Sequence, residues 1–391
     1  MTTYMKRIAV NCGGSHVPGL NAVISGAVLA ASELGWEVVG IRDGFDGLLF
    51  PERYPAGGLL ELTPQVVESL GTGGSPILGN ATHTDPFRVR QVNAENMVEE
   101  VDRSGELIGK ITTERIDAVI SVVGPQALSL LFRLHRQGLR TVCVPTSVEN
   151  DVAATQLSFG FNSALSFAVD MLERIRQAAQ AARQIGVVEV LGEHAGWLAL
   201  QAGIAACADA VLIPEIPYDL QKVAAKLTGK IEAGRAAGLV VVAEGARPRD
   251  GQEAAGAATP SDALRASLSP GSTGEGGPHV IESSGRVAHA VALRLQRLTD
   301  CATYPLVLGP LVRGGPPTAV DRQLGLSYGA AAVRAVYRNQ SGVMVAFEPP
   351  ALRFVPLADA INKVRTVPAD SVFVQSARSL GISLGDGEVM P

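Results

Sequence analysis

Short strand-like runs alternate with amphipathic stretches of helical spacing along most of the chain, and this alternation limits the fold more than any other feature. Such alternation is typical of parallel βαβ units. The first unit runs from a strand over 7–11 through a glycine-rich turn and a helix over 20–34 to a strand over 37–41. The same pattern returns at 118–144 and from 187 to 243. The sequence therefore predicts an α/β protein.

The length and the hydrophobic content predict two lobes rather than one. A chain of 391 residues with 47% hydrophobic residues can bury more than one core. We expect two doubly wound, mainly parallel-sheet lobes with a cleft between them, where the carboxyl ends of strands collect ligands. One lobe is predicted from 1–150 plus part of 310–391, and the other from 151–309. The segment 247–278 is rich in Gly, Ala, Ser and Pro, and we predict a mobile insertion there.

Composition and charge exclude several classes of protein. A net charge of −5 without a basic stripe argues against a nucleic-acid partner. The apolar runs are far shorter than the roughly 20 residues that a membrane-spanning helix needs. The four cysteines form no CxxC pair, which argues against a zinc site. Because no leader-like apolar stretch opens the chain, a cytoplasmic location is expected.

Several glycine-rich and acidic motifs follow the predicted strands. They are Gly13-Gly14 with Pro18-Gly19-Leu20-Asn21, Gly40-Ile41-Arg42-Asp43-Gly44, Asn150-Asp151, Phe159-Gly160-Phe161, Gly196-Trp197, Ile213-Pro214-Glu215, Ala243-Glu244-Gly245 and Arg313-Gly314-Gly315 with Asp321-Arg322. In this order, from about residue 6 to residue 335, they resemble the phosphofructokinase family. The resemblance implies a phosphofructokinase-like fold with one lobe for the phosphoryl donor and one for the sugar. It also implies the glycolytic phosphorylation of fructose 6-phosphate with magnesium and either ATP or pyrophosphate.

The resemblance also assigns candidate site residues. The donor-phosphate loop is expected at Gly13, Gly14, His83 and Gly124, because glycines let backbone N–H groups approach phosphates. Glu149 and Asp151 resemble the catalytic carboxylates of the family, with Glu149 as the base toward the sugar hydroxyl. Substrate-binding roles are implied for Glu193, Glu244 and Arg313. Glu149 is one methylene longer than the family's aspartate, which moves the carboxylate by about 1 Å.

Other positions depart from the family pattern. Pro125 stands where a metal-binding aspartate is usual, and proline offers neither a carboxylate nor an N–H, so no protein ligand for a metal is expected there. Cations that the family uses around its phosphates are replaced at five positions, and these are Thr82, Gln184, Glu193, Tyr304 and Pro310. Thr146 occupies the position that usually separates ATP-dependent from pyrophosphate-dependent members, so the donor stays open.

Two hypotheses follow. In the first, the chain has lost conventional fructose 6-phosphate phosphorylation and acts as a phosphate-ligand-binding, regulatory or pseudoenzyme subunit, because the lost cations remove electrostatic stabilisation. The alternative is an active 6-phosphofructokinase, or a related sugar phosphotransferase, with a re-made pocket. The loss of five cations from the expected phosphate sites favours the first hypothesis. A purely structural role for the motifs also stays open, since the glycines suit tight turns and Glu149 and Asp151 suit a helix cap.

The expected partners follow from the same resemblance. We predict a small phosphorylated molecule as ligand and a homo-oligomer, or a hetero-oligomer with an active relative. No nucleic-acid or membrane partner is expected.

Overall fold

The computed structural model describes residues 6–70, 75–80, 84–92, 96–234, 237–249 and 285–387. The chain divides into two compact units. Unit 1 comprises Met1–Ala164 and Arg313–Arg365, and unit 2 comprises Leu165–Val312 and Thr366–Pro391. Of the mobile insertion predicted at 247–278, only residues 247–249 are among the described residues. The prediction that this segment is mobile therefore stays untested.

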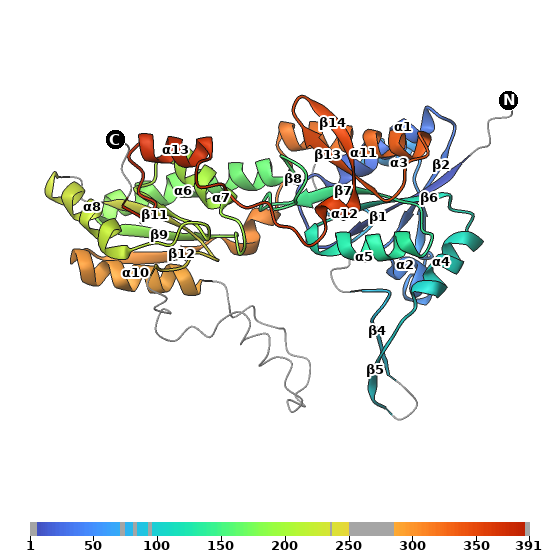
Figure 1. The fold of residues 1–391 in the computed structure, drawn as a ribbon, viewed down its shortest axis with the longest axis horizontal. Coiled ribbons are helices and arrows are strands. Elements are labelled where there is room, and N and C mark those ends of the chain that lie inside the picture. Colours follow the sequence, from blue (N-terminus) through green and yellow to red (C-terminus); the bar gives the residue numbers. More distant parts are fainter. Residues whose placement is uncertain are drawn as a thin grey trace. The chain divides into compact units, whose positions relative to one another are not determined.

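Unit 1 is built on a large, mainly parallel sheet with the strand order β14-β13-β7-β6-β1-β2-β3, and β8 pairs with β7 (Figure 1). Only the edge pairs β2–β3 and β13–β14 are antiparallel among the described strands of this sheet. The strands are β1 Arg7–Gly13, β2 Glu37–Ile41, β3 Leu59–Glu61, β6 Ala118–Val123, β7 Thr141–Ser147, β8 Phe159–Gly160, β13 Val343–Glu348 and β14 Ala351–Pro356. The parallel centre agrees with the βαβ pattern in the sequence.

Helices cover both faces of this sheet (Figure 1). The helices of unit 1 are α1 Leu20–Ser32, α2 Asp46–Leu49, α3 Pro64–Ser69, α4 Ser104–Thr113, α5 Pro125–Arg136, α11 Ala319–Tyr337 and α12 Leu357–Ala360, with a 3₁₀ turn at Pro51–Arg53 and the start of α6 Phe161–Ala182. Helices α1 and α11 pack closely through glycines. A Cβ at Gly26 would collide with the Leu326 carbonyl, and one at Gly329 with the Val23 carbonyl. Larger residues at either glycine would separate the two helices.

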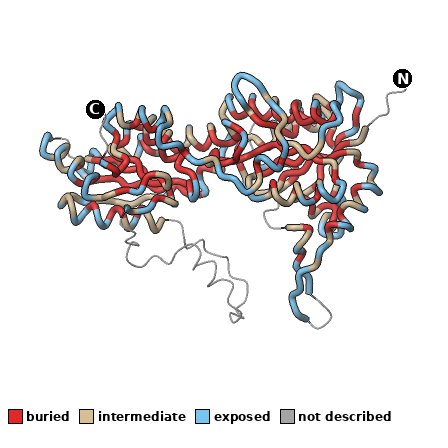
Figure 2. Tube along the Cα trace, in the orientation of Figure 1, coloured by how far each residue is buried: buried red, intermediate tan, exposed pale blue. Residues whose placement is uncertain are grey.

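The core of unit 1 lies between the sheet and α5. Its buried members come from β1, β2 and β6, such as Ala9 and Val119, and from the inner face of α5, such as Leu128 and Leu131. Figure 2 shows the buried residues concentrated along the strands at the centre of each unit. Burial of both faces explains why the strands read as continuous apolar runs.

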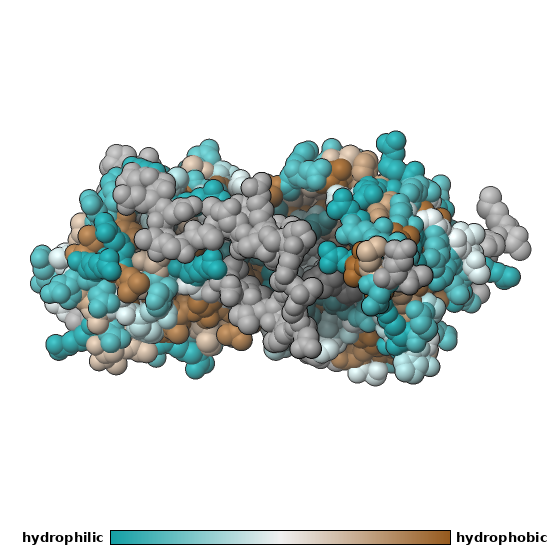
Figure 3. All heavy atoms as spheres, turned by 90° about the horizontal axis from the view of Figure 1, so that it is seen from below, coloured by the Kyte–Doolittle hydropathy of each residue, from teal (hydrophilic) through white to brown (hydrophobic). Residues whose placement is uncertain are grey.

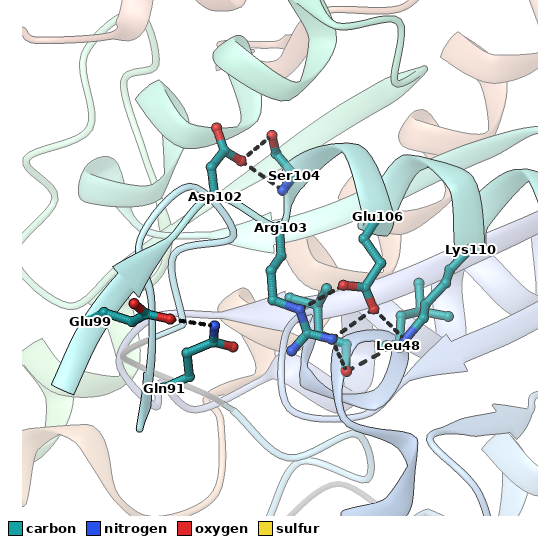
Figure 4. Close-up of polar contacts among 9 residues, drawn as sticks. Leu48, Gln91, Glu99, Asp102, Arg103, Ser104, Glu106 and Lys110 are labelled. Carbon is teal, nitrogen blue, oxygen red and sulfur yellow. Dashed lines mark hydrogen bonds and ion pairs between the residues drawn. The ribbon is translucent and has the colours of Figure 1, made fainter. Parts of the chain in front are cut away.

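A polar network fastens α4 to the end of α2 (Figure 4). Glu106 lies between Arg103 and Lys110, at 2.7 Å and 2.8 Å. Lys110 Nζ donates to the Leu48 carbonyl at 2.9 Å, and Arg103 donates to the Leu49 carbonyl at 3.0 Å. These cations satisfy carbonyls that the last turn of α2 leaves without partners. A separate antiparallel ribbon, β4 Val89–Val92 with β5 Val98–Val101, precedes α4.

Unit 2 has a smaller sheet with the order β10-β11-β9-β12, in which every described pair is parallel. The strands are β9 Ile185–Val190, β10 Ala210–Leu212, β11 Gly238–Ala243 and β12 Thr303–Val307. The helices are the remainder of α6, α7 Trp197–Ala205, α8 Leu220–Glu232, α10 Arg286–Thr299 and α13 Val372–Ser379, with a 3₁₀ turn at Gly309–Arg313. Helices α8 and α10 bury apolar residues such as Val223 and Val291 against one face.

The α/β class with mainly parallel sheets is therefore confirmed. No helix among the described residues is both long and apolar enough to cross a membrane. Where described residues are visible in Figure 3, the hydrophobic patches are separated by hydrophilic residues.

Candidate functional site

Three loops meet at the carboxyl edge of the central strands of unit 1. They follow β1, β6 and β7, which are neighbours in the sheet. A Cβ at Gly14 would lie 3.6 Å from Gly124 N, and a Cβ at Gly124 would lie 3.6 Å from the Thr146 carbonyl oxygen. The predicted phosphate-loop residues Gly13, Gly14 and Gly124 therefore gather at one edge, as ligand sites of α/β sheets do.

Proline suits position 125 because of the local structure. It occupies the first turn of α5, directly after the cap residue Gly124. The first helical N–H groups have no partner inside a helix, so proline loses nothing there, and its fixed φ suits the helix start. The substitution removes a carboxylate but does not disturb the fold of the loop.

The loop after β7 carries the predicted catalytic carboxylates. Ser147 Oγ donates to Asp151 Oδ1 at 2.5 Å and accepts the Glu149 N–H at 3.0 Å. Asn150, between them, has φ of 55° and accepts the Ser158 N–H at 2.9 Å. No helix begins directly after this loop, because the next described elements are β8 and then α6. The helix-cap interpretation of Glu149 and Asp151 therefore has no helix to act on.

Arg313 and Glu149 form an ion pair in unit 1. Arg313 Nη2 lies 3.3 Å from Glu149 Oε1, and the two side chains are 25% and 17% exposed. Partial burial weakens solvent screening of this pair relative to a surface pair. The sequence names these two residues separately, one as a substrate-binding cation and one as a base. The structure brings them together.

His16 lies near the same cation. Burial, and then the positive charge of Arg313, lower the pKa of His16 below its usual value. This environment favours the neutral form of the imidazole. A cavity of about 270 Å³ opens beside this histidine, with Asn21, Gly315 and Arg322 among its lining residues.

The candidate residues of unit 2 gather at the carboxyl ends of β9 and β11. Glu244 Oε1 accepts the Gly192 N–H at 3.3 Å, and Gly245 N donates to the Gly192 carbonyl at 3.1 Å. Glu193 is exposed on the same turn. Its carboxylate is therefore available to solvent at this edge, where Glu244 holds the turn in place.

The other substituted positions lie as follows. Tyr304 is on β12, and its hydroxyl donates to the Ile175 carbonyl at 3.2 Å. Gln184 is half-buried directly before β9, and Pro310 is exposed in the 3₁₀ turn. Thr82 and His83 fall outside the described residues, so the predicted role of His83 has no structural description.

Asp151 is a carboxylate at the edge of unit 1 that fits a magnesium ion. In the described part of the chain, no three His, Cys, Asp or Glu side chains gather as a metal site. Magnesium, however, commonly uses one or two carboxylates and completes its shell with water and substrate phosphates. Asp151 Oδ1 is bonded to Ser147, whereas Oδ2 has no hydrogen bond with a described residue. Asp151 can therefore supply one oxygen, which Pro125 cannot.

Comparison with known proteins decides the family. A family model described as phosphofructokinase matches residues 7–336. The chain belongs to the phosphofructokinase family. The match runs from β1 through the Arg313 loop to the last turn of α11.

Two relatives of nearly the same length carry the same name. The ATP-dependent 6-phosphofructokinase of Chloroflexus aurantiacus is 37% identical over 389 residues, which cover 99% of each chain. The protein of the same name from Chloroflexus aggregans is 38% identical over 389 residues, again with 99% of each chain covered. Among solved structures, a pyrophosphate-dependent phosphofructokinase from Nitrosospira multiformis superimposes with a TM-score of 0.73 at 19% identity, covering 99% of this chain and 93% of that one. That likeness shows the phosphofructokinase-like fold alone.

These relatives contradict the prediction of a pseudoenzyme subunit. Proteins named as ATP-dependent 6-phosphofructokinases align with this chain from end to end, which favours the alternative of an active phosphotransferase. The prediction was wrong because it inferred lost activity from the combined loss of cations, whereas relatives that are 37% and 38% identical over 99% of the chain are named for the activity. Pro125 is one of the substituted positions, and at the start of α5 it is compatible with a folded loop.

Sequence reasoning missed two residues at this edge. Ser147 was not singled out, although it positions both carboxylates of the loop. A serine two residues before Glu149, at the end of a buried strand, is a signal that could have identified it. Asp321 was noted only as part of a motif, yet it is fully buried and bonded to Ser163. Its partner is 158 residues away in sequence, so no local pattern reveals it.

Proposed function

We propose that this protein transfers the γ-phosphoryl group of ATP to a hydroxyl of fructose 6-phosphate. The products are fructose 1,6-bisphosphate, ADP and one proton. The observation that carries the proposal is the identity of 37% and 38% over 99% of the chain with relatives named for this activity. Thr146 leaves the donor open in the sequence, and the relatives' name favours ATP.

Glu149 is the residue we assign as base. Its carboxylate takes the proton of the acceptor hydroxyl as the oxygen attacks the γ-phosphorus. A positioned base of this kind contributes roughly a hundredfold to ten-thousandfold in rate. Arg313, 3.3 Å from Glu149, places a fixed positive charge beside the base, where an anionic acceptor would be attracted. Gly13, Gly14 and Gly124 leave room for the donor phosphates at the same edge.

Asp151 would hold the magnesium ion that accompanies ATP. When bound, this ion neutralises charge on the transferring phosphoryl group. Ser147 keeps the Asp151 carboxylate in place through the 2.5 Å hydrogen bond to Oδ1. The oxygen left for the ion is Oδ2.

Several finer predictions belong to this proposal. Glu193 and Glu244 are assigned to substrate binding at the edge of unit 2. Assignment of unit 1 to the donor and unit 2 to the sugar follows the family resemblance. A homo-oligomer in the cytoplasm remains our expectation for the assembled protein.

Phosphorus NMR of the purified protein tests this proposal and identifies the donor. With magnesium, ATP and fructose 6-phosphate, we expect a second sugar-phosphate resonance to grow as ADP forms in equal amount. Pyrophosphate replaces ATP in a parallel sample. Product only from pyrophosphate would contradict the donor assignment, and product from neither would contradict the proposed reaction.

A further inference from the structure

Two helices of unit 1 begin beside each other at one buried carboxylate. Ser163 lies in the first turn of α6, and Asp321 lies in the first turn of α11. Asp321 Oδ2 accepts both the N–H and the Oγ–H of Ser163, each at 2.6 Å. Thr318, the cap residue of α11, accepts the Asp321 N–H at 3.3 Å. One carboxylate therefore serves the starts of both helices.

This arrangement departs from an ordinary capping box. In a capping box, the acidic side chain in the first turn returns to the N–H of the cap residue. Here the Thr318 N–H donates to Ser163 Oγ at 2.9 Å instead, and the Ser163 hydroxyl in turn donates to Asp321 Oδ2. Asp321 is 0% exposed and Ser163 is 6% exposed, so water does not compete for these bonds. The positive ends of two helix dipoles also face the carboxylate.

Ser163 and Asp321 anchor the end of the loop that leads from Arg313 to α11. Gly314 and Gly315 make the first half of the loop flexible, and Gly315 has φ of 85°. Pro316 and Pro317 fix φ in the second half. No backbone group of residues 314–317 hydrogen-bonds to another described residue. The loop is therefore held at its ends, by Arg313 on Glu149 and by the Thr318 N–H on Ser163.

We propose that Ser163 and Asp321 are positioning residues for Arg313, because they fix the far end of the loop that places its guanidinium on Glu149. Neither residue touches the reacting groups. Loss of the Ser163 hydroxyl frees the Thr318 N–H, and the stiff Pro316-Pro317 half then moves as a unit. The glycine half makes no hydrogen bond of its own with the described residues, so it cannot replace the lost anchor. Arg313 consequently loses its fixed distance from Glu149.

Ser163→Ala tests this inference through kinetics, a readout that rests on the proposed function. We expect the KM for fructose 6-phosphate to rise about tenfold while the KM for ATP changes less than about twofold, since only the acceptor would meet a misplaced Arg313. Should Ser163→Ala not fold, Asp321→Asn, which removes the charge that accepts the Ser163 N–H and hydroxyl, takes its place. Equal changes in both KM values would overturn the inference.

The chain offers a control with the same two hydrogen bonds at the start of α4, where the accepting Asp102 is exposed and local in sequence. Ser104 donates both its N–H, at 2.9 Å, and its Oγ–H, at 2.6 Å, to Asp102 Oδ1, as Ser163 does to Asp321 (Figure 4). Ser104 is 1% exposed and lies outside the proposed site. Ser104→Ala should leave both KM values unchanged. A rise in acceptor KM equal to that of Ser163→Ala would show a general loss of stability and overturn the inference.

A second readout needs no activity. The coupling between Arg313→Gln and Glu149→Gln is measured in urea unfolding, in three backgrounds: unmodified, Ser163→Ala and Ser104→Ala. In the unmodified and Ser104→Ala backgrounds, we expect the effect of the double substitution on the unfolding constant to differ about threefold from the product of the two single effects. In the Ser163→Ala background, we expect no such difference. Coupling that survives Ser163→Ala overturns the inference. If the unmodified protein shows no turnover, the proposed function fails and this cycle alone decides the positioning role.

Discussion

Arg313 Nη2 lies 3.3 Å from Glu149 Oε1, so the cation and the carboxylate that the family resemblance singles out form one ion pair. The pair is partly buried within unit 1, and a serine hydroxyl anchors the segment that carries each of its two residues. Ser147 accepts the Glu149 N–H, and Ser163 anchors the loop that carries Arg313.

Ser147→Ala tests whether Asp151 needs its 2.5 Å hydrogen bond. The variant leaves the carboxylate free to rotate, and it also frees the Glu149 N–H. We expect kcat to fall by roughly ten- to a hundredfold, because small displacements of reacting groups are costly. Steady-state kinetics at saturating magnesium checks this. Unchanged kcat would mean that neither carboxylate depends on Ser147.

Gly14→Ala tests the donor loop, and Gly138→Ala is its matched control. Gly14 has φ of 108° and Gly138 has φ of 105°, so alanine strains both backbones equally. Each substitution should cost about 1–2 kcal/mol of stability. Only Gly14 lies beside Gly124, so only Gly14→Ala should raise the KM for ATP, by about tenfold. Equal KM values in the two variants would remove Gly14 from the donor site.

Glu106 predicts a specific loss of stability in acid. Hydrogen bonds from Arg103 and then Lys110 lower its pKa to about 2 from the usual 4.5. The folded state favours the charged form, so the stabilisation is complete above about pH 4.5 and is lost as pH falls toward 2.

Urea unfolding of Glu106→Gln between pH 5 and pH 2 measures this term. The variant should lose less stability over that range than the unmodified protein, and added salt should shrink the difference because Glu106 is 39% exposed. Glu33→Gln, at an exposed position, serves as the control. Parallel curves for Glu106→Gln and the unmodified protein would contradict the prediction.

Lys226 predicts a dependence of the same sign in base, with stability again rising with pH. Burial, and then the nearby Lys230, lower its pKa to about 8 from 10.5. Its ammonium donates to the Asp209 carbonyl at 2.6 Å and to the Gly381 carbonyl. Because the unfolded chain binds the proton more tightly, stability should rise with pH between about 8 and 10.5 through this group.

Lys226→Met should flatten that rise, whereas Lys363→Met, at an exposed position, should not. Unfolding midpoints at pH 8, 9 and 10 provide the measurement. A rise as steep in Lys226→Met as in the unmodified protein would rule out this lysine as its source.

The sequence predicts the central strands well because they are buried on both faces. The strand expected at 37–41 coincides with β2, and the pattern expected at 118–144 begins with β6. The ribbon of β4 and β5 was not predicted, since the inner residues of both strands, Arg90-Gln91 and Glu99-Glu100, are polar and leave no alternating apolar face. Short helices such as α2, with four residues, offer too little periodicity to be recognised.

The site is partly visible in the sequence for a similar reason. Glu149 and Gly124 follow buried strands, where the chain order alone places functional loops. The partners of those loops are distant in sequence. Arg313 meets Glu149 across 164 positions, and Asp321 meets Ser163 across 158. Only the folded chain reveals these pairs.

The most direct test of the proposed function is the rate at which the purified protein forms fructose 1,6-bisphosphate from ATP, magnesium and fructose 6-phosphate, compared with Glu149→Gln. We expect the unmodified protein to turn over at roughly 1–100 s⁻¹, the range typical of kinases. Glu149→Gln should fold normally and lose at least about a hundredfold in kcat. No turnover in the unmodified protein, or equal kcat in both, would contradict the assignment of this chain as a phosphofructokinase that uses Glu149 as its base.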